Sequence, residues 1–136
     1  MFNKFEHIGV AVRDLKKAVP FFEKLTGTRC YKQQEVESEG VITAFFRIGE
    51  TKLELLQATR PDSPVMKFIE SRGEGIHHIA FHVDNVEEAM EKAKSHGVRL
   101  ISMQAKQGAD NKLIAFMHPK DTFGVLMELC QEDDLH

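Results

Sequence analysis

The stretch Gly75–Val83, which reads GIHHIAFHV, is a short apolar run that carries three histidines. Side chains of a β-strand alternate between its two faces. We therefore expect a strand here with one core face and one site face. The core face carries Ile79, Phe81 and Val83. The site face carries His78, Ala80 and His82.

The same pattern occurs earlier in the chain, at His7–Val12. Its histidine shares a face with the small residues Gly9 and Ala11, as His78 does with Ala80. A helix-like stretch follows each copy, over residues 14–26 and 85–96. The chain therefore contains an internal repeat.

Each half of the repeat also places one carboxylate inside an apolar strand. Glu54 lies between Leu53 and Leu55, and Glu128 lies between two apolar residues in the same way. A buried carboxylate is costly unless it is paired or binds a metal. A lone strand histidine is ordinarily a packing or surface residue, but two histidines and two carboxylates at matched places favour a site for a divalent metal of intermediate hardness.

Turn and capping residues divide the chain into two βαβββ modules. The first has a strand at 5–12, a helix from Asp14 to a stop at Gly27, and strands at 29–37, 41–48 and 51–58. We expect Pro20 to cause a kink or a late start of that helix, with Phe21, Phe22 and Leu25 facing the core. A short linking helix near residues 65–69 ends at Gly73.

The second module repeats this order. Its strand at 76–83 is followed by a helix over 86–95, a stop at Gly97 and strands near 99–104, 112–118 and 123–131. Residues 105–111 form a polar loop at the border of the site. The prediction is an α+β fold in a single domain, 1–136, with module one at 1–60, a linker helix at 61–75, module two at 76–131 and a tail at 132–136.

Composition narrows the class of protein. The chain has 136 residues, 42% of them hydrophobic, which suits one compact domain. A net charge of −3 argues against a general nucleic-acid binder. No stretch approaches the ~18 apolar residues of a membrane span, and the first residues lead straight into a strand, so we expect a cytoplasmic protein. Cys30 and Cys130 are expected to be buried thiols.

The remaining histidines are not expected to be metal ligands. His77 shares the face of Ile79 and is assigned to packing, whereas His82 is placed beside the pocket. His118 precedes a proline and is either a turn residue or a substrate contact. His96 and His136 are expected at the surface.

The doubled βαβββ pattern, with a histidine in the first strand and a glutamate near the last strand of each half, resembles the vicinal oxygen chelate (glyoxalase/bleomycin resistance/dioxygenase) superfamily. The resemblance covers Phe5 to Gln131. Within it, four motifs resemble the methylmalonyl-CoA epimerases: LELL at 53–56, PDSP at 61–64, GEGIHHI at 73–79, and HPK at 118–120 followed by GVLMEL at 124–129.

This resemblance implies a glyoxalase-like fold, a curved mixed sheet around a metal-binding cleft. It also implies one divalent ion (cobalt, manganese, zinc or nickel) with four ligands, His7, Glu54, His78 and Glu128. Glu54 stands at a position that is glutamine in some members. The implied reaction moves a proton at the α-carbon of methylmalonyl-CoA through a metal-stabilised enolate, and Glu128 is the first candidate for a proton carrier.

The second proton carrier departs from the family pattern. At least one member has a glutamate on the strand after the equivalent of Gly40, but residues 41–46 here contain no carboxylate. Three candidates stay open: Glu54, Glu39 reached through a loop movement, or a metal-bound water. The predicted catalytic residues are therefore Glu128 and Glu54.

Two other functions fit the same pattern. The first is another metal-dependent enzyme of this fold, a glyoxalase I-like lyase or a thiol transferase, and the ligand set does not separate it from an epimerase. The second is a metal-free small-molecule binding protein, which would have no reason to keep four metal ligands. The expected partners are an acyl-CoA, whose phosphates could contact Lys106, Lys112 or Lys120, and a second copy of the chain in a homodimer.

Overall fold

The computed structural model describes residues 2–132, which fall into two units. One unit comprises residues 7–77, and the other comprises residues 2–6 together with 78–132. The chain passes between them inside two strands, β1 (Phe2–Ala11) and β5 (Gly75–Val83). Each unit contains both helix and sheet, so the α+β class is confirmed.

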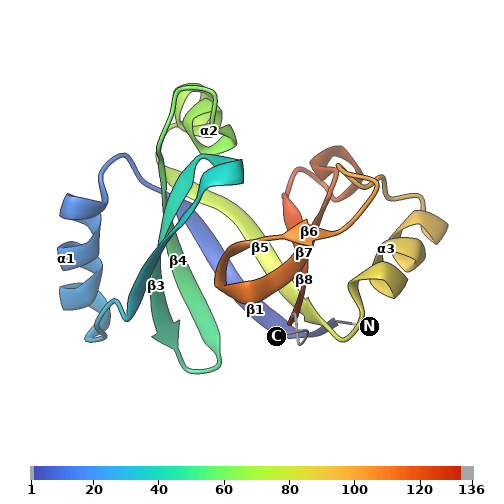
Figure 1. Ribbon diagram of the computed structural model, residues 1–136, viewed down its shortest axis with the longest axis horizontal. Coiled ribbons are helices and arrows are strands. Elements are labelled where there is room, and N and C mark those ends of the chain that lie inside the picture. The colour runs from blue at the N-terminus through green and yellow to red at the C-terminus, as the bar shows by residue number, and fades with distance from the viewer. Residues whose placement is uncertain (1, 133–136) are drawn as a thin grey trace. The chain divides into compact units, whose positions relative to one another are not determined.

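The unit of residues 7–77 contains a mixed four-stranded sheet in the order β2-β3-β4-β1 (Figure 1). The C-terminal half of β1 runs parallel to β4, whereas β2 and β4 are each antiparallel to β3. The elements are α1 (Leu15–Thr26), β2 (Lys32–Val36), a 3-10 turn η1 (Glu37–Glu39), β3 (Val41–Ile48), β4 (Thr51–Ala58) and α2 (Pro64–Arg72).

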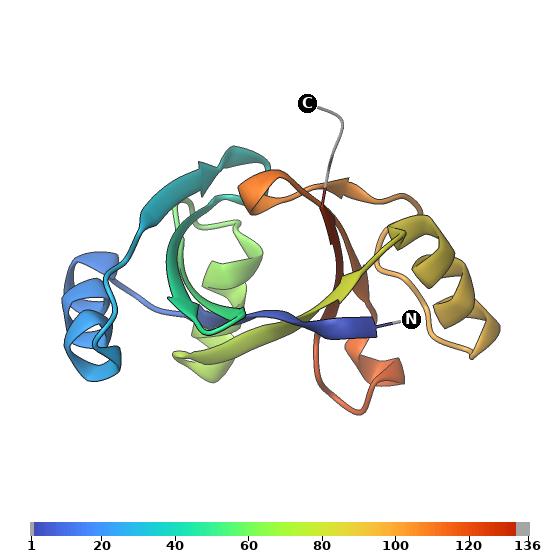
Figure 2. The ribbon, with the colours of Figure 1, turned by 90° about the horizontal axis from the view of Figure 1, so that it is seen from below.

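Two helices cover different parts of this sheet. Helix α1 packs on one face through a cluster that contains Leu15, Ala44, Phe46 and Leu55. Helix α2 packs through Val65 and Ile69 on residues that include Ala11, Val41 and Leu56. Figure 2 shows α1 and α2 on opposite sides of these strands. The face under α2 is the one that continues to His7 and Glu54, because residues two apart on a strand share a face.

Helix α1 begins where the sequence predicts but tolerates its proline differently. Asp14 caps it by accepting a hydrogen bond from the Lys16 N–H, and Gly27 ends it in the left-handed conformation. The expected late start at Pro20 is wrong, since the helix runs through this exposed residue. Phe22 packs on the sheet, but Phe21 and Leu25 are 59% and 68% exposed, because they lie to one side of the stripe that faces the sheet.

The other unit has the strand order β5-β8-β7-β6. Strands β5 and β8 are parallel, and β7 is antiparallel to both of its neighbours. The elements after β5 are α3 (Val86–Ser95), β6 (Lys106–Gln107), η2 (Ala109–Asn111), β7 (Lys112–Met117), η3 (Pro119–Asp121) and β8 (Met127–Glu132). Helix α3 has the predicted bounds, and Asn85 caps it by accepting from the Glu88 N–H.

Two of the strands predicted in this half are wrong in part. Within the predicted strand at 99–104, the sheet contact is a single bridge between Leu100 and Met117. The last strand starts at Met127 and not at residue 123, because Phe123 and Gly124 have φ angles of 60° and 88°, which a strand does not allow. The segment predicted as a loop contains the short strand β6 and the turn η2.

The two faces of β5 also differ from the expected core and site faces. His78 and Ala80 are buried, while Ile79 and Phe81 are only half-buried. Phe81 contacts two aromatic rings of β1, with ring centroids 4.5 Å from Phe2 and 5.1 Å from Phe5. Only Val83 of the predicted core face joins the cluster under α3. The histidine face is therefore the more deeply buried of the two.

Asp121 gives the unit a contribution to stability that depends on pH. Its carboxylate accepts hydrogen bonds from the backbone and guanidinium of Arg99, which lower its pKa to about 2. Because the folded pKa lies below the unfolded value, this stabilisation is complete above about pH 4 and is lost as the pH falls towards 2. We expect Asp121→Asn to flatten the acid limb of a plot of unfolding free energy against pH, measured with urea. An unchanged acid limb would show that this ion pair contributes nothing, as is common for exposed pairs.

Among the described residues, no helix is long and apolar enough to cross a membrane.

Candidate functional site

The unit of residues 7–77 contains a buried pair formed by His7 and Glu54. The Nδ1 atom of His7 lies 3.2 Å from the Oε2 atom of Glu54, and both side chains are almost fully buried. The parallel pairing of β1 and β4 sets this contact, because Glu54 stands opposite Gly9, two residues beyond His7. The two predicted ligands of the first half are thus in contact.

The other unit contains the corresponding pair, His78 and Glu128. The Nε2 atom of His78 lies 3.1 Å from the Oε1 atom of Glu128, and both side chains are again buried. Strands β5 and β8 are parallel, and Glu128 stands opposite Ala80, two residues beyond His78. The ring of Phe116 meets His78 edge-on at 5.6 Å between centroids, which fixes one side of the imidazole.

The two pairs have the same construction. In each, the carboxylate lies on a parallel neighbour, opposite the small residue that follows the histidine by two positions, Gly9 or Ala80. Residues two apart on a strand are separated by about 7 Å, so the two side chains meet diagonally across the strands. A glycine or alanine leaves the space for that diagonal contact. The repeat seen in the sequence is therefore also a repeat of strand register.

The donors in each pair suit a divalent metal ion. Imidazole nitrogen and carboxylate oxygen bind such ions at about 2.1 Å, so two adjacent ligands lie roughly 3.0–3.4 Å apart. The distances of 3.2 Å and 3.1 Å agree with this spacing. They equally agree with a hydrogen-bonded imidazole–carboxylate pair. Metal analysis of the purified protein distinguishes the two.

The other predicted histidines have structural contacts. His77 is half-buried against the ring of Phe68, at 5.0 Å between centroids, as its packing role predicts. His82 lies 3.0 Å from the side-chain amide of Asn3, in an exposed hydrogen bond. The Nδ1 atom of His118 accepts from the Lys120 N–H at the start of η3, which favours a turn role. His96 contacts the Lys92 carbonyl, and His136 lies outside the described residues.

Strand β3 contributes no carboxylate to the histidine face. Thr43 is buried there, opposite Leu56 of β4, and Phe45 is opposite Glu54. Glu39 ends the 3-10 turn η1, where its carbonyl accepts from the hydroxyl of Ser63. Glu54 is therefore the carboxylate that β4 contributes to this unit's buried pair, whereas Glu39 is half-buried in the turn η1.

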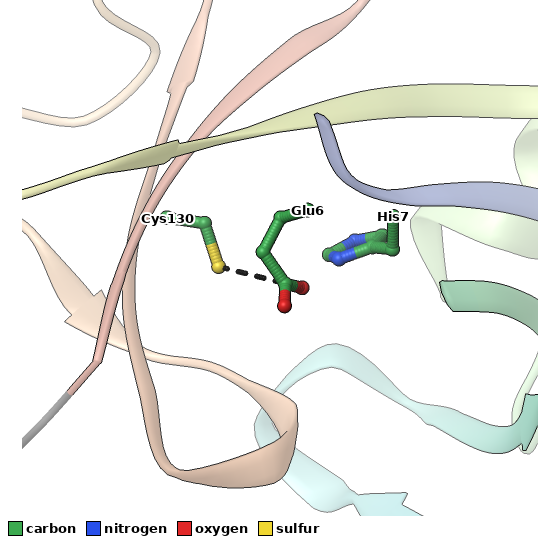
Figure 3. Close-up of side chains that lie close together, drawn as sticks. All are labelled: Glu6, His7 and Cys130. Atoms are coloured by element: carbon green, nitrogen blue, oxygen red, sulfur yellow. Dashed lines mark hydrogen bonds between the residues drawn. The ribbon is translucent and has the colours of Figure 1, made fainter. Parts of the chain in front are cut away.

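Sequence reasoning missed a third buried carboxylate, Glu6, which is 6% exposed. Figure 3 shows Glu6 and Cys130, where the thiol donates to the Oε1 atom of Glu6 at 4.0 Å. Cys130 is buried, as predicted, whereas Cys30 is half-buried and donates to the Lys32 carbonyl. Glu6 was missed because strict alternation puts it on the opposite face from His7, yet both are buried.

Sequence reasoning also missed a buried lysine. Lys52 is 5% exposed and stands in β4 two residues before Glu54. Its partners across the sheet are His7 in β1 and Arg47 in β3. Alternation along β4 is the signal that could have found it, because Lys52, Glu54 and Leu56 share one face.

Known proteins resemble the chain over most of its length. The sequence profile of the Glyoxalase/Bleomycin resistance protein/Dioxygenase superfamily matches residues 6–116. An uncharacterised protein, YqjC, of Bacillus subtilis is 43% identical over 95% of this chain and 92% of its own. Human mitochondrial methylmalonyl-CoA epimerase is 37% identical over 95% of this chain and 74% of its own. Streptomyces coelicolor methylmalonyl-CoA epimerase, solved in complex with 2-nitronate-propionyl-CoA, superposes with a TM-score of 0.93 at 35% identity, covering 97% of this chain and 99% of that one.

Proposed function

This chain belongs to the Glyoxalase/Bleomycin resistance protein/Dioxygenase superfamily, and on that premise we propose that it is a metal-dependent epimerase of methylmalonyl-CoA. The observation that carries the proposal is the pair of buried histidine–glutamate contacts in matching register, in a chain homologous to methylmalonyl-CoA epimerases. Its substrate is accordingly an acyl-CoA thioester. The Streptomyces coelicolor relative was solved in complex with 2-nitronate-propionyl-CoA.

His7, Glu54, His78 and Glu128 would together hold one divalent ion of cobalt, manganese, zinc or nickel. The support lies in their donor types, their burial and the spacing inside each pair. When bound, such an ion polarises the thioester carbonyl and offsets the negative charge that develops as the α-proton leaves. Because it would favour the enolate over the substrate, whose acyl group carries one negative charge fewer, it would lower the barrier.

The two glutamates would move the protons. In our proposal a carboxylate oxygen of Glu128 removes the α-proton from one face of the substrate, and Glu54 delivers a proton to the opposite face. The forward reaction starts with Glu128 ionised and Glu54 protonated, and the reverse reaction starts from the opposite states. Exchange of these carboxyl protons with solvent water restores the starting states, so each turnover is balanced. Glu54 is preferred over Glu39 because it is buried in contact with a histidine, whereas Glu39 is half-buried in the turn η1.

The proposal also covers the assembly of the protein and its location. We propose that the chain forms a homodimer, as proteins of this superfamily commonly do, and that it acts in the cytoplasm. Size-exclusion chromatography with light scattering measures the first directly.

The function is tested by proton exchange in deuterated water. Metal-loaded protein is incubated with one epimer of methylmalonyl-CoA, and α-deuterium incorporation and inversion are followed by NMR and chiral analysis. We expect deuterium at the α-carbon of the inverted product at a rate far above the metal-depleted control. Folded, metal-bound protein that exchanges no α-proton would overturn the epimerase and favour a lyase or a thiol transferase of this fold. Protein that retains no metal under any loading condition would favour a small-molecule binder.

A further inference from the structure

Lys52 takes no part in the proton transfers described above, yet it is buried beside residues of the proposed site. It lies opposite His7 in the pairing of β1 with β4, and two residues before Glu54 on the same strand. The residue is only 5% exposed, although its side chain is long. A buried ammonium is costly unless an anionic or polar group compensates it. A positive charge in this position affects which ligands the surrounding face can bind.

The face of the sheet that carries His7 and Glu54, here called the His7 face, is rich in positive charge. Among its strand positions within residues 32–58, all of which the structure describes, the charged side chains are Lys32, Arg47, Lys52 and Glu54. The ammonium of Lys32 lies 4.9 Å from the ring centroid of Phe45, which stands opposite Glu54. Arg47 stands over Tyr31 at 5.5 Å.

Three cations thus accompany one carboxylate, and a divalent ion would add further positive charge. A face with that balance is suited to a ligand that brings negative charge of its own. Of the three cations, Lys52 is the buried one, in register with His7 and next to Glu54 on its face. Arg47 is exposed and Lys32 is half-buried, so both are more accessible to solvent than Lys52 is.

We propose that Lys52 binds the free carboxylate of the substrate's acyl group and thereby selects thioesters of the malonyl type. This inference rests on the proposed function, because it places the reacting acyl group at the His7 face. Lys52 acts as a fixed positive charge and neither gives nor takes a proton. Loss of the α-proton would add a second negative charge to the acyl group. A nearby ammonium stabilises this doubly charged enolate more than it stabilises the singly charged substrate.

Two acyl-CoA ligands separate this role from binding of the CoA phosphates. Methylmalonyl-CoA and propionyl-CoA carry the same CoA, but only the first has the free carboxylate. Calorimetric titration of metal-loaded wild type should therefore show a preference for methylmalonyl-CoA. In Lys52→Met we expect affinity for methylmalonyl-CoA to fall by about 30-fold or more, the usual size for a buried charge pair that loses one partner, while affinity for propionyl-CoA stays within about twofold.

Three controls distinguish a role of Lys52 in carboxylate binding from a general disruption of the structure. Lys112→Met removes another buried lysine, which pairs with Glu132 at 2.8 Å, and should leave the preference intact. Lys52→Arg keeps the charge and should keep most of the preference. If Lys52→Met does not fold, the wild type is titrated with the carboxamide analogue of methylmalonyl-CoA, which should bind like propionyl-CoA.

The outcomes separate this inference from the epimerase proposal. An equal loss for both thioesters in Lys52→Met, a loss of bound metal, or an unchanged preference would overturn the role of Lys52 while deuterium exchange by the wild type still stood. A preference that depends on Lys52 in a protein without exchange would keep the inference and overturn the epimerase. Wild type that binds neither thioester would overturn both.

Discussion

Replacing His78 with alanine is expected to lower the rate of α-proton exchange by more than about 100-fold and to reduce the bound metal. The imidazole Nε2 atom contacts the Glu128 carboxylate in a buried site, so alanine removes one donor and leaves the other in a cavity. Loss of a group that merely supports a metal ligand costs about 10- to 100-fold in affinity or activity, and a direct ligand should cost more. The measurements are deuterium incorporation into methylmalonyl-CoA and metal content by mass spectrometry.

The chain provides a matched control in the preceding residue. His77 is also a histidine of β5, but it packs against Phe68 and belongs to the other face of the strand. His77→Ala should therefore keep both the metal and the exchange rate, at some cost in stability. Equal losses in the two variants would mean that the damage comes from the strand and not from a ligand. Full metal content in His78→Ala would contradict the assignment of His78 as a ligand.

The sequence predicted the repeat well because the same physical pattern determined it twice. Alternation placed each histidine beside a small residue, and the structure adds that each carboxylate stands opposite that residue, Gly9 or Ala80. Capping chemistry was equally informative: α3 has its predicted bounds, and Asn85 caps it. The superfamily inferred from the doubled βαβββ pattern, with its repeated histidines and glutamates, is confirmed by the profile match.

Elements that depend on local backbone conformation or distant partners were predicted less well. The start of β8 was placed too early because the positive φ angles at Phe123 and Gly124 have no unique signature in sequence. The region around Arg99 was expected to be a strand, but the backbone N–H and the guanidinium of Arg99 donate hydrogen bonds to Asp121. Asp121 lies 22 residues later in the chain, and sequence periodicity does not reveal a partner at that distance.

Buried charges were the main omission at the candidate site. In a strand, the residues around a polar side chain indicate whether it belongs to the surface or to a site. Lys52 lies between Thr51 and Leu53, and no lysine at a matching place in the repeat indicated that it is buried. Glu6 and His7 are consecutive and both buried, which strict alternation excludes. Such residues become visible only when strand register and burial are known.

Glu128→Gln and Glu54→Gln are each expected to lower inversion of methylmalonyl-CoA by about 10²- to 10⁴-fold, the usual contribution of one general acid or base. Glutamine keeps the size and one ligating oxygen but neither accepts nor releases a proton at neutral pH. With two carriers on opposite faces, losing one blocks inversion yet leaves the other able to exchange the proton that faces it. Each variant should therefore still incorporate deuterium into one epimer, and the two variants should prefer opposite epimers.

This epimer-specific exchange separates proton carriers from simple ligands. If Glu54→Gln inverts the substrate at the wild-type rate while Glu128→Gln does not, Glu54 serves only as a ligand, and Glu39 or a water molecule carries the second proton. Glu39→Gln tests the first of these, since its side chain lies in the turn η1 and should not alter metal content. Loss of metal in Glu54→Gln would remove this variant as evidence, so metal content is measured on the samples used for exchange. Strand β3 offers Thr43 on the same buried face and no acidic group, so in our proposal the second role falls to a residue outside β3.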